Sequence, residues 1–574
     1  MPGITGFIKT NSNFNIDNMT NSMMNFDKLV KGDTFSDDKV IISEVKLDFC
    51  KNKFLDKDDL IIFVNGNCFN ITEINQQFKL NASVIEEIFY EAYKNNILDS
   101  VLKNINGFFE AVIYDKNNSK ISLISDRRGT HFLFYYIKDN HFAFAGEAKS
   151  IVSLKDIDLT INKNSFNCFM ELGYLLQDAT WFENIKLIKP SSIFEYNINT
   201  GEYSQRYYWK FSEIKPSQIT YDEAVNKLAK LLPNAVKKMY FKDDILLVPL
   251  SGGLDSRMIA VSLYEQNHNT EQNFVTFGEK GCRDIEISSL IAKKMKQTHR
   301  TYSITNENVV VDRKNDIWYI DGLHSIQHTH GFNTAKYFPK ETTTYFTGIV
   351  GGEIYGAVYR PDDEYVDKLP SKEMFKNIFK NQINLLNIND DYYNLHSYYP
   401  IILDNAIRKF SLVSMSYTFT HHDVMFPFLD NDLLDFILSV PDEYKKDYKL
   451  YFDALKKAFP YWYTKIPFQS ADGFNPETWL QKRKRKFMTK IRKIFKIHEQ
   501  GHYFDYAKYI QNPDTQLEMD KILSSKNNFI SAQGDDFISK YKNENWENIR
   551  FNPDLALKLI TVKLYFDKIE EILK

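Results

Sequence analysis

One short stretch in the middle of the chain limits the fold more than any other. Residues Ile245–Leu250 (ILLVPL) form a continuous apolar run, which is typical of a strand buried on both faces of a parallel sheet. The turn Ser251–Ser256 (SGGLDS) follows directly, and a helical pattern comes next. A strand, a tight turn and a helix in this order predict a doubly wound α/β domain.

The turn has the composition of a phosphate-binding loop. Gly252 and Gly253 let the backbone approach a ligand closely, and consecutive N–H groups before a helix attract anions. Ser251 and Ser256 add hydroxyl donors. The carboxylate of Asp255 would repel a phosphate unless a divalent cation lay between them, so Mg²⁺ is expected here. No Lys follows the second glycine, which excludes the GxxxxGK[ST] loop; a tight turn with an incidental Asp stays the alternative.

The neighbouring segments fit the same fold. Apolar residues recur at helical spacing over Tyr221–Met239, a second strand is expected over Asn273–Phe277, and a second helix over Asp284–Lys296. From about residue 370 onward the pattern is mostly helical, and it ends in an amphipathic helix over Leu555–Leu573.

The first 200 residues instead predict an antiparallel-sheet domain with few helices. A polar linker, Phe211–Thr220, ends this region, and one helix is expected near Ser83–Tyr93. Short turns such as KNNSK and KDN join successive strands. The expected strands are Lys39–Phe49, Leu60–Asn70, Phe108–Asp115, Lys120–Asp126, His131–Ile137 and His141–Ala145.

Composition narrows the class of protein. The 72 basic and 75 acidic residues give a formal charge of -3, which argues against a nucleic-acid partner. Cys50, Cys68, Cys168 and Cys282 are isolated, so neither a disulfide framework nor a structural zinc site is expected. The first residues, MPGITGFIKT, lack the pattern of a signal peptide, and no run of 18 apolar residues occurs. A cytoplasmic location is therefore expected.

The loop after a buried strand resembles the pyrophosphate loop of N-type ATP pyrophosphatases. Within that group, roughly residues 1–470 resemble the asparagine synthetase family, which includes β-lactam synthetase and the lasso-peptide cyclases. The segments that match in the family's order are Met1–Ile4 (MPGI), Asn65–Gly66, Ser125–Tyr136, Phe144–Lys149 (FAGEAK), Tyr207–Trp209, Asp284–Ala292 and Pro427–Asp430 (PFLD).

The resemblance implies a fold and a reaction. Residues 1–210 would form an α+β, Ntn-hydrolase-like (glutaminase-like) antiparallel β-sandwich with helices. Residues 221–470 would form an α/β, N-type ATP pyrophosphatase domain with a parallel sheet, of the adenine nucleotide α-hydrolase type, and residues 471–574 a helical extension. In the family, ATP activates a carboxylate as an acyl-adenylate with release of pyrophosphate, and an amine then forms an amide.

The family pattern also implies site residues. Pyrophosphate and Mg²⁺ would be held by the loop, with Asp255 as the metal ligand. Leu250 and Phe277 would flank the adenosine, and Thr347 and Gly348 would lie at the nucleotide. The loop residues implied in ATP binding are Ser251, Gly252, Gly253, Leu254, Asp255 and Ser256.

The N-terminal part departs from the family at its nucleophile. Position 2 is Pro2, which has no thiol and cannot form the glutaminase thioester. The family's NGE turn ends in Asn67, Glu44–Lys46 stands where a His-Arg pair is expected, and Ala82–Ser83 stands where an Asp is expected. The resemblance therefore implies a domain kept as scaffold, as in β-lactam synthetase, whose amine lies on the substrate.

The synthetase part departs as well. The family's SGxGxDE motif has Ile349 in place of the residue that serves the amine, and Gly352 in place of the second magnesium-binding Asp. Glu353 keeps the neighbouring carboxylate, with a helix cap as its structural alternative. The family's late Arg and Lys are replaced by Gln469 and Ala471.

The leading interpretation is an ATP-dependent amide-forming ligase with ATP and Mg²⁺ as cofactors. It would join a small-molecule or peptide carboxylate to an amine that its own glutaminase site does not supply. The alternatives are an asparagine synthase-like enzyme that uses free ammonia, a nucleotide-binding relative without catalysis, and an amidating enzyme associated with a membrane or polymer.

Two further features stay open. Asp321, His324 and His328 have the spacing of one helix face, which indicates a metal or acid/base cluster or, as the favoured reading, an ordinary polar face. Lys482–Lys496 (KRKRKFMTKIRKIFK) has the pattern of a basic amphipathic helix. Such a helix binds a membrane surface, a polyanion or an acidic partner, or is simply solvated on one face.

Overall fold

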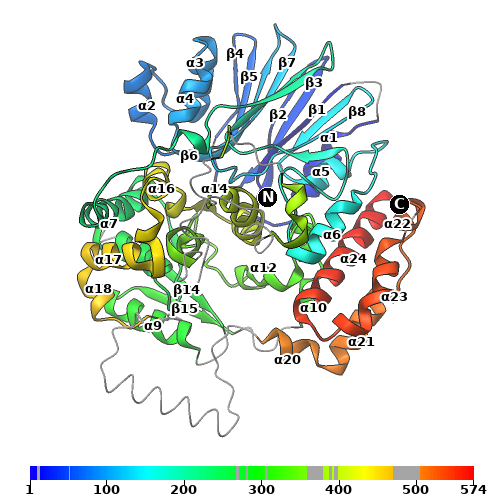
Figure 1. The fold of residues 1–574 in the computed structure, drawn as a ribbon. Coiled ribbons are helices and arrows are strands. Elements are labelled where there is room, and N and C mark those ends of the chain that lie inside the picture. Colours follow the sequence, from blue (N-terminus) through cyan, green and yellow to red (C-terminus); the bar gives the residue numbers. More distant parts are fainter. Residues whose placement is uncertain are drawn as a thin grey trace.

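The computed structural model shows an upper β-sandwich joined to a lower α/β part, with a helical bundle at one side (Figure 1). It describes residues 1–9, 13–50, 52–266, 271–278, 282–303, 308–357, 379–386, 391–393, 399–468, 505–534 and 536–574. The predicted basic helix Lys482–Lys496, Gln469 and Ala471 lie outside the described residues.

Two antiparallel six-stranded sheets form the sandwich, in the orders β10-β8-β9-β1-β3-β2 and β12-β11-β7-β6-β5-β4. Apolar side chains from both sheets meet between them, and Ile42, Phe63, Val112 and Leu123 are fully buried there. The strands are β1 (Gly3–Ile8), β2 (Leu29–Ser36), β3 (Val40–Leu47), β4 (Leu55–Lys57), β5 (Leu60–Cys68), β6 (Gly107–Asp115), β7 (Lys120–Ser125), β8 (Phe134–Lys138), β9 (His141–Ala145), β10 (Ile185–Leu187), β11 (Ser192–Asn197) and β12 (Tyr203–Tyr207).

The six predicted strands are confirmed, with shifted ends. The largest shift is at the strand expected over His131–Ile137, since β8 begins only at Phe134. The carboxylate of Asp126 accepts hydrogen bonds from the backbone N–H groups of Arg128 (2.7 Å) and Thr130 (2.9 Å). This turn keeps the chain out of the sheet until residue 134.

The sandwich has more helices than the single one expected. The predicted helix is α3 (Ile85–Lys94). The others are short, and packing and caps hold them: the side chain of Asn15 caps α1 and that of Asn162 caps α6. These helices are α1 (Ile16–Met23), α2 (Ile71–Phe78), α4 (Leu98–Asn104), α5 (Ala148–Val152) and α6 (Lys163–Leu172).

The lower part contains a parallel five-stranded sheet in the order β15-β14-β13-β16-β17, which confirms the expected doubly wound pattern. The strands are β13 (Leu246–Pro249), β14 (Gln272–Phe277), β15 (Thr298–Tyr302), β16 (Thr344–Phe346) and β17 (Asp423–Met425). The predicted helices are present as α7 (Tyr221–Lys238), which begins in a Thr220–Glu223 capping box, and α9 (Arg283–Met295); α8 (Asp255–Gln266) follows the loop.

Short helices surround this sheet. The α-helices are α10 (Val309–Arg313), α11 (Asp316–Tyr319), α12 (His330–Ala335), α14 (Tyr399–Ile402), α15 (Ser416–Phe419), α16 (Asn431–Ser439), α17 (Lys449–Ala458) and α18 (Pro460–Thr464). The 3-10 and π segments are η1 (Phe211–Glu213), η2 (Ile326–His328), η3 (Glu353–Ala357), η4 (Lys380–Leu385), η5 (Leu403–Leu412), η6 (Pro427–Leu429) and η7 (Asp442–Tyr448).

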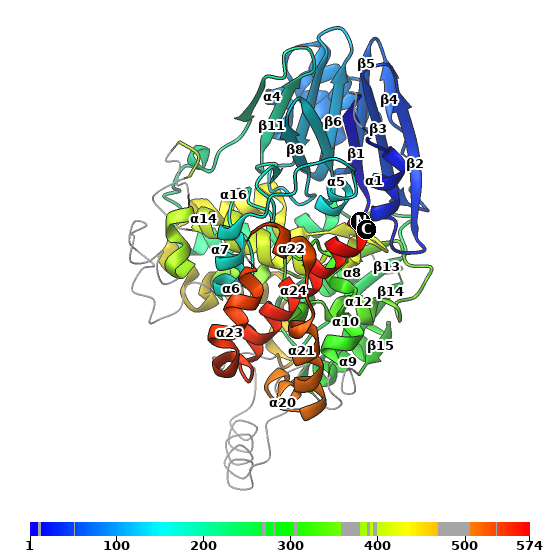
Figure 2. The same cartoon turned by 90° about the vertical axis from the view of Figure 1, so that its right-hand side faces the viewer.

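The C-terminal bundle contacts both other parts (Figure 2). It consists of α20 (Tyr506–Ile510), α21 (Pro513–Ser524), α22 (Asn528–Ala532), α23 (Phe537–Ile549) and α24 (Pro553–Leu573). On α24, Lys558 Nζ approaches the Glu171 carbonyl of the sandwich at 3.4 Å, and Thr561 Oγ1 accepts from the Ile326 N–H at 2.8 Å. Among the described residues, no helix is long and apolar enough to cross a membrane.

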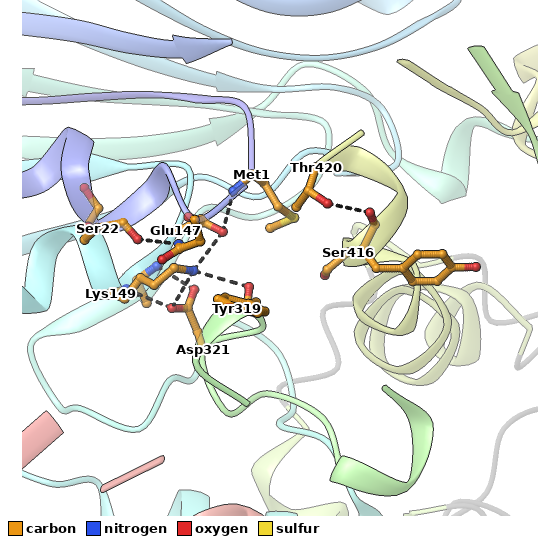
Figure 3. Close-up of polar contacts among 12 residues, drawn as sticks. Met1, Ser22, Glu147, Lys149, Tyr319, Asp321, Ser416 and Thr420 are labelled. Carbon is orange, nitrogen blue, oxygen red and sulfur yellow. Dashed lines mark hydrogen bonds and ion pairs between the residues drawn. The ribbon is translucent and has the colours of Figure 1, made fainter. Parts of the chain in front are cut away.

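A buried charged network joins the sandwich to the α/β part (Figure 3). The Asp321 carboxylate accepts from the N–H groups of Ala148 (2.8 Å) and Lys149 (2.9 Å), at the start of α5. The Lys149 ammonium lies 2.8 Å from Glu147 and 3.5 Å from Asp321, and all three side chains are at most 3% exposed. Asp321 therefore caps a helix of the other domain.

Candidate functional site

A cavity of about 410 Å³ lies at the carboxyl ends of β13, β14 and β16. In doubly wound sheets this edge is where ligands bind. Most of the predicted nucleotide residues line it: Leu250, Ser251, Gly253, Asp255, Ser256, Phe277, Thr347 and Gly348. Gly252 and Leu254 belong to the same loop but do not line the cavity; the Leu254 carbonyl accepts from the Tyr463 hydroxyl at 2.9 Å.

The two serines of the loop hold its shape. The hydroxyls of Ser251 and Ser256 are 2.9 Å apart, and Ser256 Oγ also accepts from the Ser251 N–H at 3.0 Å. The Gly253 N–H donates to Ser251 Oγ (3.2 Å), and the Gly252 N–H donates to Asp284 Oδ1 (2.8 Å). A phosphate oxygen would take these donors over from Asp284 and Ser251.

Asp255 begins α8 and is one of the residues that line the cavity. Burial raises the pKa of Asp255 to about 7, and the nearby charge of Glu353 acts in the same direction. The Tyr451 hydroxyl donates to Asp255 Oδ1 at 2.8 Å and opposes this rise. An ionised carboxylate at this depth calls for a cation beside it.

The segment 347–353 packs tightly against Asp255. A methyl group on Gly348 would come within 2.7 Å of the Ser256 nitrogen, and one on Gly351 within 2.7 Å of Asp255 Cγ. A Cβ at Gly352 would lie 3.3 Å from Asp255 Oδ2, so a carboxylate at this position would stand beside that of Asp255. Because position 352 is Gly352, this chain lacks the second carboxylate that the family pattern has beside Asp255.

The remaining groups still fit a magnesium ion. Mg²⁺ in nucleotide sites is commonly held by one or two carboxylates together with phosphate oxygens. Asp255 would be the first carboxylate. Glu353 follows at the start of η3, and burial raises its pKa. When bound, the ion would neutralise phosphate charge and polarise the α-phosphate.

The far wall of the cavity was not predicted from the sequence. It is built by residues from α15, η5, η2 and β16, segments without a recognisable motif. The sequence places Asp284 only in a matching helix, and His330 packs on Phe277 with ring centroids 5.0 Å apart. His328 and Ile349, which the sequence indicates for other roles, also line the cavity. The remaining lining residues are Pro249, Val275, Thr276, Asp284, His330, Tyr345, Phe410, Ser414, Met415 and Tyr417.

The expected helix face of Asp321, His324 and His328 does not exist. The helix α11 ends at Tyr319, and Asp321 (φ 54°) and Gly322 (φ 62°) turn the chain through the left-handed region. Asp321 reaches the sandwich, whereas the rings of His324 and His328 lie 4.6 Å apart, with only His328 at the cavity. No metal-binding group of three such residues occurs in the described part of the chain.

A second, very small cavity lies at Pro2. Its volume is about 20 Å³, which is room for roughly one water molecule. Glu110, Thr130, His131, Phe132 and Phe419 are among the residues around it. This is the place where the family pattern has its glutaminase nucleophile.

The other altered positions of the sandwich have structural partners. Glu44 pairs with Lys46 at 3.1 Å. The Asn67 amide donates to Asp423 Oδ2 at 2.6 Å, a contact that links the sandwich to β17.

Comparison with known proteins finds two family models in the expected order. The first is described as a glutamine amidotransferase domain and matches residues 1–209. The second is described as asparagine synthase and matches residues 227–400.

Several curated relatives are similar over part of their length. A chain of Methanocaldococcus jannaschii assigned as glutamine-hydrolysing asparagine synthetase 2 is 27% identical over 55% of this chain and 63% of its own. The glutamine-hydrolysing asparagine synthetases 1 and 2 of Bacillus subtilis are each 23% identical, over 52% and 69% of this chain and 48% and 59% of their own. The chain thus spans less than two thirds of these three relatives.

Among solved structures, a glutamine phosphoribosylpyrophosphate amidotransferase of Bacillus subtilis is similar over 49% of this chain and 67% of its own. Its sequence identity is 11% and its TM-score 0.26.

Proposed function

The chain belongs to the asparagine synthetase family, and from this premise we propose that it is an ATP-dependent amide-forming ligase. A carboxylate oxygen of the substrate would bond to the α-phosphorus of ATP while the bond between the α- and β-phosphates breaks and pyrophosphate leaves. An amine would then displace AMP from the acyl-adenylate. The observation that carries the proposal is the cavity at the ends of the parallel strands, which the loop Ser251–Ser256 and the buried Asp255 line together.

The residues of the chain have distinct tasks in this proposal. The N–H groups of Gly252 and Gly253 and the hydroxyls of Ser251 and Ser256 would bind the phosphates. Asp255 would hold Mg²⁺ at the same phosphates. Leu250 and Phe277, at the ends of adjacent strands, would flank the adenosine.

We further propose that the amine does not come from glutamine hydrolysed by the sandwich domain. Pro2 has no nucleophile, and the cavity beside it is far too small for glutamine. Wild type should therefore release no glutamate from glutamine, while pyrophosphate release stays unchanged by a glutaminase inhibitor. Because the cavity has no room for glutamine, Pro2→Cys should not restore hydrolysis. Glutamate formation by wild type, measured with a coupled dehydrogenase assay, would overturn this part of the proposal.

A second candidate is a nucleotide-binding protein without ligation, favoured by Ile349 and Gly352. Pyrophosphate release with a panel of carboxylic acids, alongside calorimetric ATP binding, separates the two. Release of pyrophosphate with any acid supports the ligase. ATP binding without pyrophosphate from any acid supports the second candidate. Amide formation from aspartate and free ammonia would instead support an asparagine synthase-like reaction.

Binding of Mg²⁺ and ATP should depend on pH through Asp255. Its pKa of about 7 means that below pH 7 a proton competes with the metal. The apparent affinity should therefore fall about tenfold per pH unit below 7 and level off above 8. Calorimetry in two buffers of different ionisation enthalpy should show about one proton more released at pH 6 by wild type than by Asp255→Asn, since the proton of the ATP γ-phosphate is common to both. At pH 8 the two proteins should release almost the same number of protons.

A further inference from the structure

The wall of the nucleotide cavity that faces away from the loop has a chemistry of its own. With Leu250 and Phe277 assigned to the adenosine and the loop to the phosphates, the remaining wall is mainly apolar and aromatic. Its members are Tyr345, Ile349, Phe410, Ser414, Met415 and Tyr417. With ATP placed in this way, the wall is the part of the cavity that would contact the acyl substrate.

The hydroxyl groups of this wall bond to other groups of the protein. The hydroxyls of Tyr345 and Tyr417 lie 3.1 Å apart and bond to each other. The ring of Tyr417 is pressed onto the backbone at Gly331, where a Cβ would come within 2.0 Å of it. Ser414 Oγ donates to the Ser411 carbonyl at 2.7 Å. The polar groups of the wall are therefore largely satisfied without a ligand.

Among the described residues that line the cavity there is no Lys or Arg. The two histidines do not supply a cation at neutral pH, since burial lowers the pKa of His328 to about 4 and that of His330 well below its usual value. The acidic residues among the described lining residues are Asp255 and Asp284.

Two arginines of the surrounding segments, Arg313 and Arg257, donate hydrogen bonds to backbone carbonyls. Arg313, which contributes to the low pKa of both histidines, donates to the carbonyls of Ile326 (3.2 Å) and Gln327 (2.9 Å). Arg257, on α8, donates to the carbonyls of Trp462, Ile466 and Pro467. A second carboxylate on the substrate would therefore meet acidic and apolar groups, and no Lys or Arg among the described lining residues would offset its desolvation.

Resting on the ligase function proposed above, we infer that the acyl substrate is a carboxylic acid with an apolar or aromatic, uncharged body. An amino-dicarboxylic acid such as aspartate does not match this wall, because no Lys or Arg among the described lining residues would pair with its second carboxylate.

The inference is tested by binding of carboxylic acids to the full chain loaded with Mg²⁺ and α,β-methylene-ATP, an analogue whose α–β bond is not cleaved. Phenylacetate and hexanoate should bind at least tenfold tighter than aspartate and succinate. Equal or tighter binding of the dicarboxylic acids, or binding of none of the four, would overturn the inference.

A charge placed in the wall tests the same point. Ser414→Lys should shift the preference toward succinate at least tenfold, and Ser414→Gln, which has similar size and no charge, should leave it as in wild type. An unchanged preference in Ser414→Lys, with analogue binding intact, would contradict the inference. Exchange of labelled pyrophosphate into ATP, measured with the same acids, tests the ligase function separately. If the acids bind selectively but no exchange occurs, ligation is refuted while the inferred substrate class is supported.

Discussion

Asp255→Asn should lower ATP-dependent pyrophosphate release by at least about a hundredfold and leave the fold intact. Asn keeps the shape of the side chain and an oxygen that accepts from the Tyr451 hydroxyl, which lies 2.8 Å from Asp255 Oδ1. The substitution removes only the negative charge that would hold Mg²⁺ at the phosphates. Loss of one group that stabilises charge in a transition state commonly costs about 10²–10³ in rate. The measurement is pyrophosphate release at saturating ATP and acid.

A matched control lies on the neighbouring helix. Asp453, on α17, accepts from the Tyr221 hydroxyl at 2.8 Å and lies outside the cavity, so Asp453→Asn changes a similar pair without touching the site. Its activity should stay within about twofold of wild type, in keeping with a group that makes no contact with the reacting atoms. Equal activity of Asp255→Asn and wild type would remove Asp255 from the site and with it the proposed metal position.

The fold could be predicted where local pattern and burial agree. Leu246, Leu247 and Val248 are fully buried because β13 is covered on both faces, whereas Ile245, just before the strand, is exposed. β13 and β14 lie where the pattern places them. Short helices such as α5 could not be predicted, because its five residues are held from outside, by the carboxylate of Asp321 at its N-terminus. Their stability depends on partners that are distant in the chain.

The candidate site also has one part that the sequence predicts and one part that it does not. The loop Ser251–Ser256 is a local structure whose ligand-binding residues are adjacent in sequence, so its composition reveals it. The far wall brings Tyr345 and Tyr417 together across 72 positions, and no spacing in the sequence indicates this. Residues of this kind become visible only when the fold places them.

Asp321 shows how a regular spacing can mislead. The positions of Asp321, His324 and His328 fit one helix face only if the chain stays helical, and Asp321 and Gly322 adopt left-handed backbone angles instead. Gly322 permits this turn, and the Tyr565 ring lies where its side chain would be. The acidic residue therefore serves the domain interface rather than a site with the histidines.

The interface role of Asp321 predicts a large loss of stability in Asp321→Ala. The substitution removes two charge-assisted hydrogen bonds to the start of α5 and leaves the buried Lys149 with Glu147 as its remaining carboxylate partner in the network (Figure 3). Breaking a buried ion pair on one side commonly costs about 3–5 kcal/mol. We expect a lower unfolding midpoint in urea and faster proteolysis between the sandwich and the α/β part.

Two further variants show whether charge, shape or mere substitution causes the loss. Asn tolerates the left-handed backbone and keeps one acceptor for α5, so Asp321→Asn should lose less stability than Asp321→Ala. The difference in stability between the two variants reports the hydrogen bond that Asn keeps and the different backbone preference of Ala. Asp17→Ala breaks an exposed pair with Lys31, in which Asp17 is 62% exposed, and should cost at most about 1 kcal/mol. If Asp321→Ala were no less stable than Asp17→Ala, the network would not hold the two parts together, and the coupling would lie in other contacts, such as that of Asn67 with Asp423 and those of α24 with α6 and η2.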